Sequence, residues 1–111
     1  MSDIAILQRQ IGEWAKHKGW APFDKRDIPT KIALMHSELS EALEEYRDDW
    51  PVNAERYTDG GKPEGIGIEL ADCVIRILEF CDNFDIKLDQ LIRIKMDYNE
   101  GRPFRHGGKI A

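Results

Sequence analysis

Residues 66–81 read IGIELADCVIRILEFC, a stretch whose apolar side chains would surround an α-helix almost completely. At 100° per residue, the polar side chains share one arc of roughly 80° on such a helix. The arc holds Glu69, Asp72, Arg76 and Glu79. A helix with so little polar surface belongs in an interior, where carboxylates are costly to bury unless a cation compensates them.

Three more helices are expected around this one. The first is expected to begin at a cap formed by Ser2 or Asp3 and to end at Gly19, and Thr30 is expected to cap the second. Prolines and glycines mark the loops between the helices. The expected helices are residues 4–18, 31–48 and 64–83, and a fourth that starts at Asp85 or Asp89 and ends near Gly101. No alternating apolar run is long enough to predict a strand. The sequence therefore predicts an all-α fold, a four-helix bundle or half of one.

Length and charge narrow the class of protein. A chain of 111 residues fits one domain, residues 1–111, with a modest core of its own. The net charge of −5 argues against nucleic-acid binding, and no apolar window approaches the roughly 18 residues of a membrane span. Cys73 and Cys81 lie eight residues apart on one expected helix, too far for a disulfide. We expect a cytoplasmic protein with reduced thiols.

A second pair of acids precedes the first. Glu38 and Glu41 are three residues apart on the helix expected at 31–48, so their carboxylates point the same way. If this helix packs antiparallel to the apolar one, Glu38 and Glu41 face Glu69 and Asp72. Four oxygen ligands suit Mg²⁺, with Mn²⁺ as a substitute, and Mg²⁺ commonly takes a substrate phosphate as a further ligand. Phosphoryl transfer or hydrolysis is the expected chemistry.

Other interpretations compete with the metal site. Arg76 follows Asp72 by four residues, so an internal ion pair could neutralise one acid. A di-iron or di-manganese bundle needs Glu-x-x-His on two helices, and no acid here has a histidine three residues later. A non-enzymatic helical interaction module would explain the amphipathic helices, but not the acids on the apolar one.

These motifs resemble those of the MazG-type all-α nucleotide pyrophosphohydrolases, whose superfamily includes dimeric dUTPases and dCTP pyrophosphatases. The family pattern is Glu-Glu-x-x-Glu followed downstream by Glu-x-x-Asp. The corresponding stretches here are Ser37-Glu38-Leu39-Ser40-Glu41 and Glu69-Leu70-Ala71-Asp72, so that Ser37 replaces the leading Glu. The segment from Lys95 to Lys109 is similar to the family's C-terminal region. The likeness covers about residues 4–110.

The resemblance implies Mg²⁺-dependent hydrolysis of nucleoside triphosphates between the α and β phosphates. The metal ligands would be Glu38, Glu41, Glu69 and Asp72. The catalytic residues would be Glu41 and Glu38, with Glu41 expected to take the proton of the attacking water. The preferred base and sugar, and the choice between clearing damaged nucleotides and adjusting the normal pool, stay open.

The resemblance also implies substrate-binding residues and an assembly. Lys95, Asn99 and Arg102 would hold phosphate oxygens, and Trp20 would contact the base. A basic tail, residues 102–111, follows and carries Arg105, His106 and Lys109. An obligate homodimer or homotetramer is expected, which fits the modest core.

Overall fold

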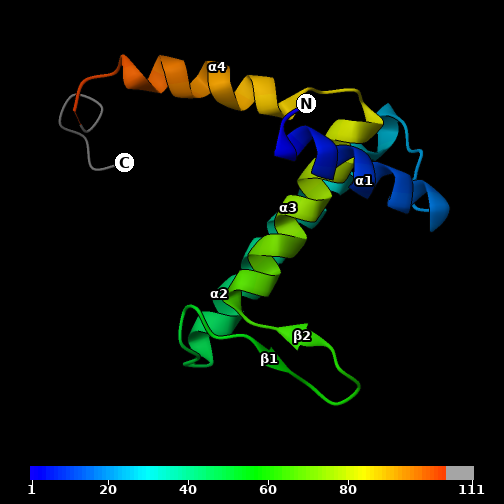
Figure 1. Ribbon diagram of the computed structural model, residues 1–111. Helices are drawn as coiled ribbons and strands as arrows, with labels where there is room; N and C mark the ends of the chain where they lie inside the picture. Colours follow the sequence, from blue (N-terminus) through cyan, green and yellow to red (C-terminus); the bar gives the residue numbers. More distant parts are fainter. Residues whose placement is uncertain (105–111) are drawn as a thin grey trace.

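The computed structural model describes residues 1–104, and it is almost entirely helical (Figure 1). Its elements are α1 (Asp3–His17), a 3-10 turn η1 (Lys25–Asp27), α2 (Ile28–Arg47), β1 (Arg56–Tyr57), β2 (Pro63–Glu64), α3 (Ile66–Asn83) and α4 (Leu88–Glu100). The all-α class is confirmed. None of the described helices is long and apolar enough to cross a membrane.

The packed unit consists of α1, α2 and α3. The helices α2 and α3 run antiparallel along their lengths, and α1 lies across the C-terminal half of α3 (Figure 1). The buried apolar side chains come from all three of these helices, namely Ile11, Ala15, Ala42, Cys73, Leu78 and Cys81. Both thiols are free. As expected for such a short chain, this core is small.

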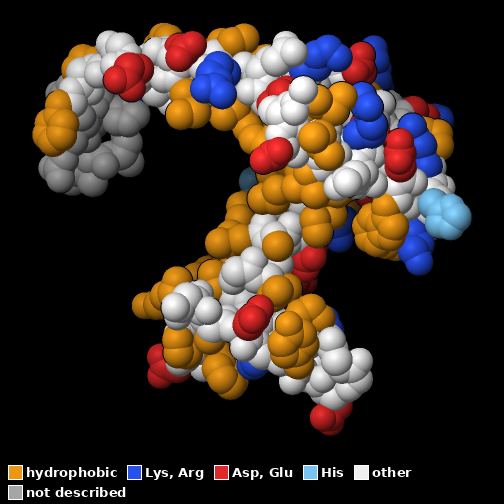
Figure 2. Space-filling view, in the orientation of Figure 1, with side chains coloured by type: hydrophobic (Ala, Val, Ile, Leu, Met, Phe, Trp, Pro, Cys, Tyr) orange, Lys and Arg blue, Asp and Glu red, His pale blue; other side chains and the backbone are white. Residues whose placement is uncertain are grey.

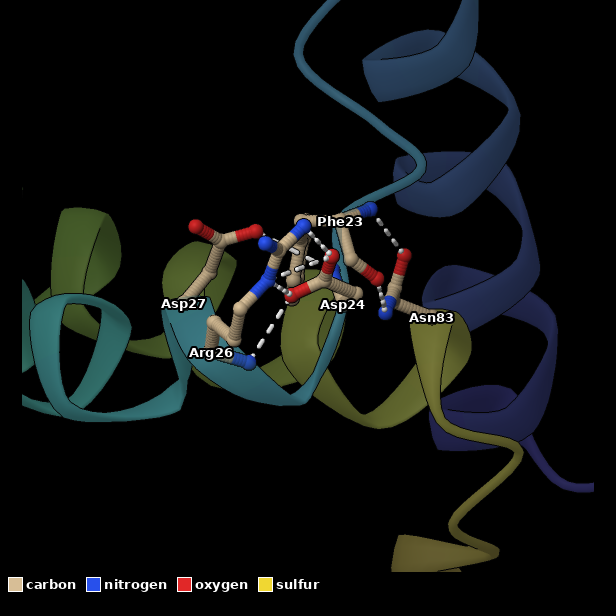
Figure 3. Close-up of polar contacts among 5 residues, drawn as sticks. All are labelled: Phe23, Asp24, Arg26, Asp27 and Asn83. Carbon is tan, nitrogen blue, oxygen red and sulfur yellow. Dashed lines mark hydrogen bonds and ion pairs between the residues drawn. The ribbon is translucent and has the colours of Figure 1, made fainter.

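The start of α2 differs from the sequence prediction. Thr30 was expected to cap the helix, but α2 begins at Ile28 with Pro29 in its first turn. Proline is accepted there because N–H groups in the first turn of a helix make no intrahelical hydrogen bond, so none is lost. Two hydrogen bonds close the preceding turn (Figure 3): the Asp24 amide donates to the Asp27 carboxylate, and the Arg26 amide donates to the Asp24 carboxylate.

The loop between α1 and α2 is fastened to the end of α3. The Phe23 amide donates to Asn83 Oδ1 at 3.0 Å, and Asn83 Nδ2 donates to the Phe23 carbonyl at 2.9 Å (Figure 3). The Phe23 ring also contacts Phe80 and Phe84. This anchoring fixes the loop that carries Trp20, whose ring meets Trp14 edge to face at 4.8 Å.

A small hairpin joins α2 to α3, where only a loop was predicted. Arg56 pairs with Glu64 and Tyr57 with Pro63. Strands of two residues are too short to show an alternating pattern, so no periodic signal predicts them. Arg56 donates to Glu45 of α2 and, at 3.1 Å, to Glu64, and it stacks on Trp50. These contacts hold the hairpin against the end of α2.

Helix α4 leaves the packed unit and does not close a bundle within one chain (Figure 1). It begins at Leu88, between the two predicted starts, and none of its residues is buried. Its exposed large apolar side chains are Leu91, Ile92, Ile94, Met96 and Tyr98. Figure 2 shows hydrophobic side chains along α4 and over the pair formed by α2 and α3.

Candidate metal centre

Three of the four predicted metal ligands converge between α2 and α3. One carboxylate oxygen each of Glu38, Glu41 and Glu69 lies within 4.8 Å of the others. Glu38 and Glu41 are one turn apart on α2, whereas Glu69 is in the first turn of α3. The antiparallel packing of the two helices brings these positions together, as the spacing of the acids predicted.

The hydrogen bonding of the buried acids sets this cluster apart. Three acids are buried among the described residues, with exposed fractions of 7% for Glu38, 9% for Glu45 and 8% for Glu69. Arg56 donates to both oxygens of Glu45. In contrast, Glu38 Oε2 and Glu69 Oε2 are buried without any hydrogen-bond partner. An unpartnered buried carboxylate oxygen is costly, and either a proton or a bound cation can offset that cost.

The donor set fits a hard divalent cation. All three converging ligands are carboxylates, and no thiol or imidazole joins the group within the described part of the chain. Oxygen-only sites with several carboxylates suit Mg²⁺ or Mn²⁺ better than zinc. The exposed Glu41 lies on the solvent side of the cluster.

Asp72 lies beside this group rather than in it. It is half-buried, it is not among the three converging ligands, and it lines the same cleft as Glu38. Burial, and then the charge of Glu38, raise the pKa of Asp72, while Arg76 and Lys62 oppose the rise. Asp72 therefore feels the negative charge of Glu38, although it is not one of the three converging ligands.

Arg76 bridges the two helices. Its Nε donates to Glu38 Oε1 at 2.9 Å. The sequence had suggested an ion pair with Asp72 on the same helix, but within the described chain the only ion pair of Arg76 is the one to Glu38. The tertiary partner competes successfully because α2 presents a buried carboxylate to the guanidinium, whereas a pair four residues apart on one helix contributes little.

A cleft of about 250 Å³ adjoins the acids. It is lined by Trp14, Trp20, Glu38, Asp72, Ile75, Arg76 and Glu79. A neighbouring pocket of about 260 Å³ shares three of these residues and adds Lys31, which pairs with Glu79 at 3.6 Å. The cleft thus combines carboxylates with aromatic rings, among them that of Trp20, the predicted base contact.

The sequence interpretation missed part of this cleft. Trp14 and Lys31, which line the cleft and the neighbouring pocket, were not predicted as site residues. Arg76 and Glu79 were visible on the polar arc of the apolar helix, which was the available signal for them. Trp14 had no such signal, because its place in the cleft depends on the loop that brings Trp20 against it.

The predicted phosphate-binding residues lie elsewhere in the single chain. Lys95 and Asn99 are on α4, Arg102 follows it, and none of the three lines the cleft. Lys95 Nζ lies 4.6 Å from the centre of the Tyr98 ring. The tail residues Arg105, His106 and Lys109 fall outside the described residues. Phosphate binding by Lys95, Asn99 and Arg102 stays a prediction.

The carboxylate cluster should make the metal-free protein less stable as the pH rises. Burial, and then the neighbouring Glu41 carboxyl, raise the pKa of Glu69 from 4.5 to about 7. The folded protein therefore holds a proton that the unfolded chain releases, and this stability is lost as the pH rises from about 4.5 through 7. We expect a loss of roughly 2–3 kcal/mol, measured by urea unfolding in the presence of a chelator.

Glu69→Gln is the control for this pH dependence, because it removes the titrating group at similar volume. The stability of the variant should fall much less than that of the wild type as the pH rises. Saturating Mg²⁺ should prevent the loss of stability of the wild-type protein at alkaline pH. A fall of the same size in wild type and Glu69→Gln would assign it to other groups.

Comparisons with known proteins identify no relative of this chain. No protein-family model matches it, and neither a curated protein nor a solved structure does. The function of these residues is therefore inferred from their geometry and their chemistry.

Proposed function

We propose that this protein is a Mg²⁺-dependent pyrophosphohydrolase, which cleaves nucleoside triphosphates between the α and β phosphates to give the monophosphate and pyrophosphate. One observation carries the proposal. Two buried carboxylates on facing helices, Glu38 and Glu69, each have an oxygen without a partner and lie beside Glu41, and Glu38 also lines a cleft that contains two tryptophan rings. The resemblance of the Glu38–Glu41 and Glu69–Asp72 motifs to MazG-type enzymes supports the same chemistry.

The carboxylates would hold the metal, and the cleft would hold the nucleotide. Glu38, Glu41 and Glu69, with Asp72 beside them, supply the oxygen ligands; Mn²⁺ is an acceptable substitute. When bound to these residues, Mg²⁺ would lower the pKa of a water ligand and offset the charge of the leaving pyrophosphate. Trp20, and with it Trp14, offers a ring to the base. We place the enzyme in the cytoplasm, where its two free thiols stay reduced.

Proton transfer falls to Glu41 in this proposal. Water forms a bond to the α phosphorus while the bond from that phosphorus to the bridging oxygen breaks, and Glu41 accepts the proton that the water loses. Glu41 suits this role because it is exposed, whereas Glu38 and Glu69 are buried. Glu38 is the second catalytic candidate, but its Oε1 already accepts a hydrogen bond from Arg76.

We further propose that the enzyme works as a homodimer or homotetramer. Large apolar side chains stay exposed on α2, α3 and α4, among them Leu39, Leu43, Leu70, Val74 and Ile94. Exposed apolar surface of this extent is typical of an interface. In such an assembly, α4 of one copy would carry Lys95, Asn99 and Arg102 to the phosphates bound by another copy.

A non-enzymatic interaction module is the second candidate, and the bare apolar face of α4 favours it. A module of that kind has no need of unpartnered buried carboxylates. Its melting temperature should be indifferent to Mg²⁺, whereas a carboxylate site should be stabilised by the bound ion.

The products of hydrolysis test the proposed activity. Incubation with Mg²⁺ and a panel of canonical and modified triphosphates should release pyrophosphate and monophosphate together, and a chelator should stop the release. The panel also identifies the preferred base and sugar. Successive appearance of diphosphate and orthophosphate would instead indicate a phosphatase.

A further inference from the structure

Arg76 is placed between the two parts of the candidate site. It contacts Glu38, one of the converging carboxylates, and it lines both the cleft beside the acids and the pocket that holds Lys31. Its side chain is 37% exposed, against 9% for that of Glu38. The guanidinium therefore has one edge on a buried acid and another toward open space.

We propose that Arg76 is an exchangeable cation of this site: it neutralises Glu38 in the metal-free protein and turns to the triphosphate when metal and nucleotide bind. This inference rests on the proposed function. It makes Arg76 a phosphate-binding residue in addition to Lys95, Asn99 and Arg102.

The hydrogen bonds of Arg76 support this exchange. Of the five N–H groups of an arginine, only Nε–H has a partner among the described residues, and that partner is Glu38 Oε1. The Nη groups donate no hydrogen bond there. Arginine binds phosphate well because its planar fork matches two phosphate oxygens at once. A guanidinium with unused donors at the edge of a cleft is suited to that partner.

The charges of the cluster explain why the contact with Glu38 is exchangeable. A divalent ion at the carboxylates would share the Glu38 side chain with Arg76, and the nearby positive charge of Arg76 would oppose the ion. Arg76 should therefore weaken metal binding when no nucleotide is present. Once a triphosphate brings several negative charges, the same guanidinium should strengthen the binding of the complex.

A purely structural ion pair predicts something else. The contact joins α2 to α3, so a structural role would make every ligand bind less well when it is removed, in proportion to the loss of stability. The proposed exchange gives opposite signs for metal alone and for metal with nucleotide. This difference in sign distinguishes the two roles.

Calorimetric titration of Arg76→Gln provides the test. We expect Mn²⁺ alone to bind the variant about three- to tenfold more tightly than wild type, because a competing cation is gone. A triphosphate analogue with a non-hydrolysable α–β bridge, titrated with Mg²⁺ present, should bind roughly ten- to a hundredfold more weakly. Arg76→Lys should keep the wild-type affinity for Mn²⁺ and recover part of the affinity for the analogue, since lysine keeps the charge but not the fork.

Arg47→Gln is the matched control. Arg47 forms an exposed ion pair with Glu44 on α2 and does not line the cleft, so neither titration should change. Parallel weakening of both ligands in Arg76→Gln, or unchanged Mn²⁺ affinity in a folded variant, would overturn the exchange. If Arg76→Gln does not fold, wild-type affinity of Arg76→Lys for the analogue would also overturn the exchange.

Failure of the proposed function gives a different result. Wild-type protein that binds Mn²⁺ and the analogue but hydrolyses no triphosphate would remove the enzymatic proposal while leaving the opposite signs intact. Wild-type hydrolysis with parallel weakening in Arg76→Gln would remove only the role of Arg76. Absence of any Mn²⁺ binding to the wild type would refute both.

Discussion

Glu69→Gln should lower kcat/KM for triphosphate hydrolysis on the order of a thousandfold, because it replaces an unpartnered buried carboxylate by a neutral amide of similar volume. Metal ions stabilise transition-state charge by several kcal/mol, and about 1.4 kcal/mol corresponds to a tenfold change in rate. The same reasoning predicts losses for Glu38→Gln, Glu41→Gln and Asp72→Asn. Steady-state pyrophosphate release at saturating Mg²⁺ is the measurement.

Glu44→Gln is the control for these four variants. Glu44 is also an acid of α2, but it is exposed, pairs with Arg47 at 2.7 Å and is not among the converging acids. Its removal should leave hydrolysis near the wild-type level. Near-normal activity in two of the four cluster variants, each shown to be folded, would refute the metal site.

Lys95→Ala and Arg102→Ala should each lower kcat/KM roughly ten- to a hundredfold, since each loses a charge-assisted contact of about 1.5–3 kcal/mol. Metal binding should change little, because these residues are proposed to touch phosphate rather than Mg²⁺. Arg93→Ala, another exposed cation of α4, is the control and should keep full activity. Unchanged efficiency in both Lys95→Ala and Arg102→Ala would leave the segment around them without a role.

Mixed assemblies test whether these residues act across copies. A preparation of Glu69→Gln and one of Lys95→Ala, each impaired alone, should regain about a quarter of wild-type activity when mixed under conditions of subunit exchange. The recovered site would combine the intact acids of one copy with the intact Lys95 of the other. No recovery in an exchanging mixture would place Lys95 and Glu69 in the same copy's site.

The sequence predicted the parts of the fold that depend on helical periodicity. Glu38 and Glu41 recur at the spacing of one turn, and the acids at 69 and 72 occupy the single polar arc of an apolar helix, so their approach follows from antiparallel packing. Gly19, expected to end the first helix, follows α1 with a φ of +77°. These features are local or follow from one helix pair.

The features that the sequence did not predict depend on contacts between distant segments. Arg76 pairs with a carboxylate 38 positions away instead of its helical neighbour Asp72. The hairpin at Arg56 is held by an acid of α2 and by Trp50, neither of which has a periodic signal. The place of α4 is harder still to predict, because its apolar face has no burial within one chain.

Hydrolysis of a deoxynucleoside triphosphate in ¹⁸O-labelled water tests the central proposal most directly. With Mg²⁺ present, mass spectrometry should find one ¹⁸O atom in the monophosphate and none in the pyrophosphate, because water is proposed to attack the α phosphorus. Glu69→Gln should produce almost no labelled monophosphate under the same conditions. Label in pyrophosphate, release of orthophosphate with diphosphate, or no turnover of any triphosphate by the folded wild-type protein would contradict the assignment.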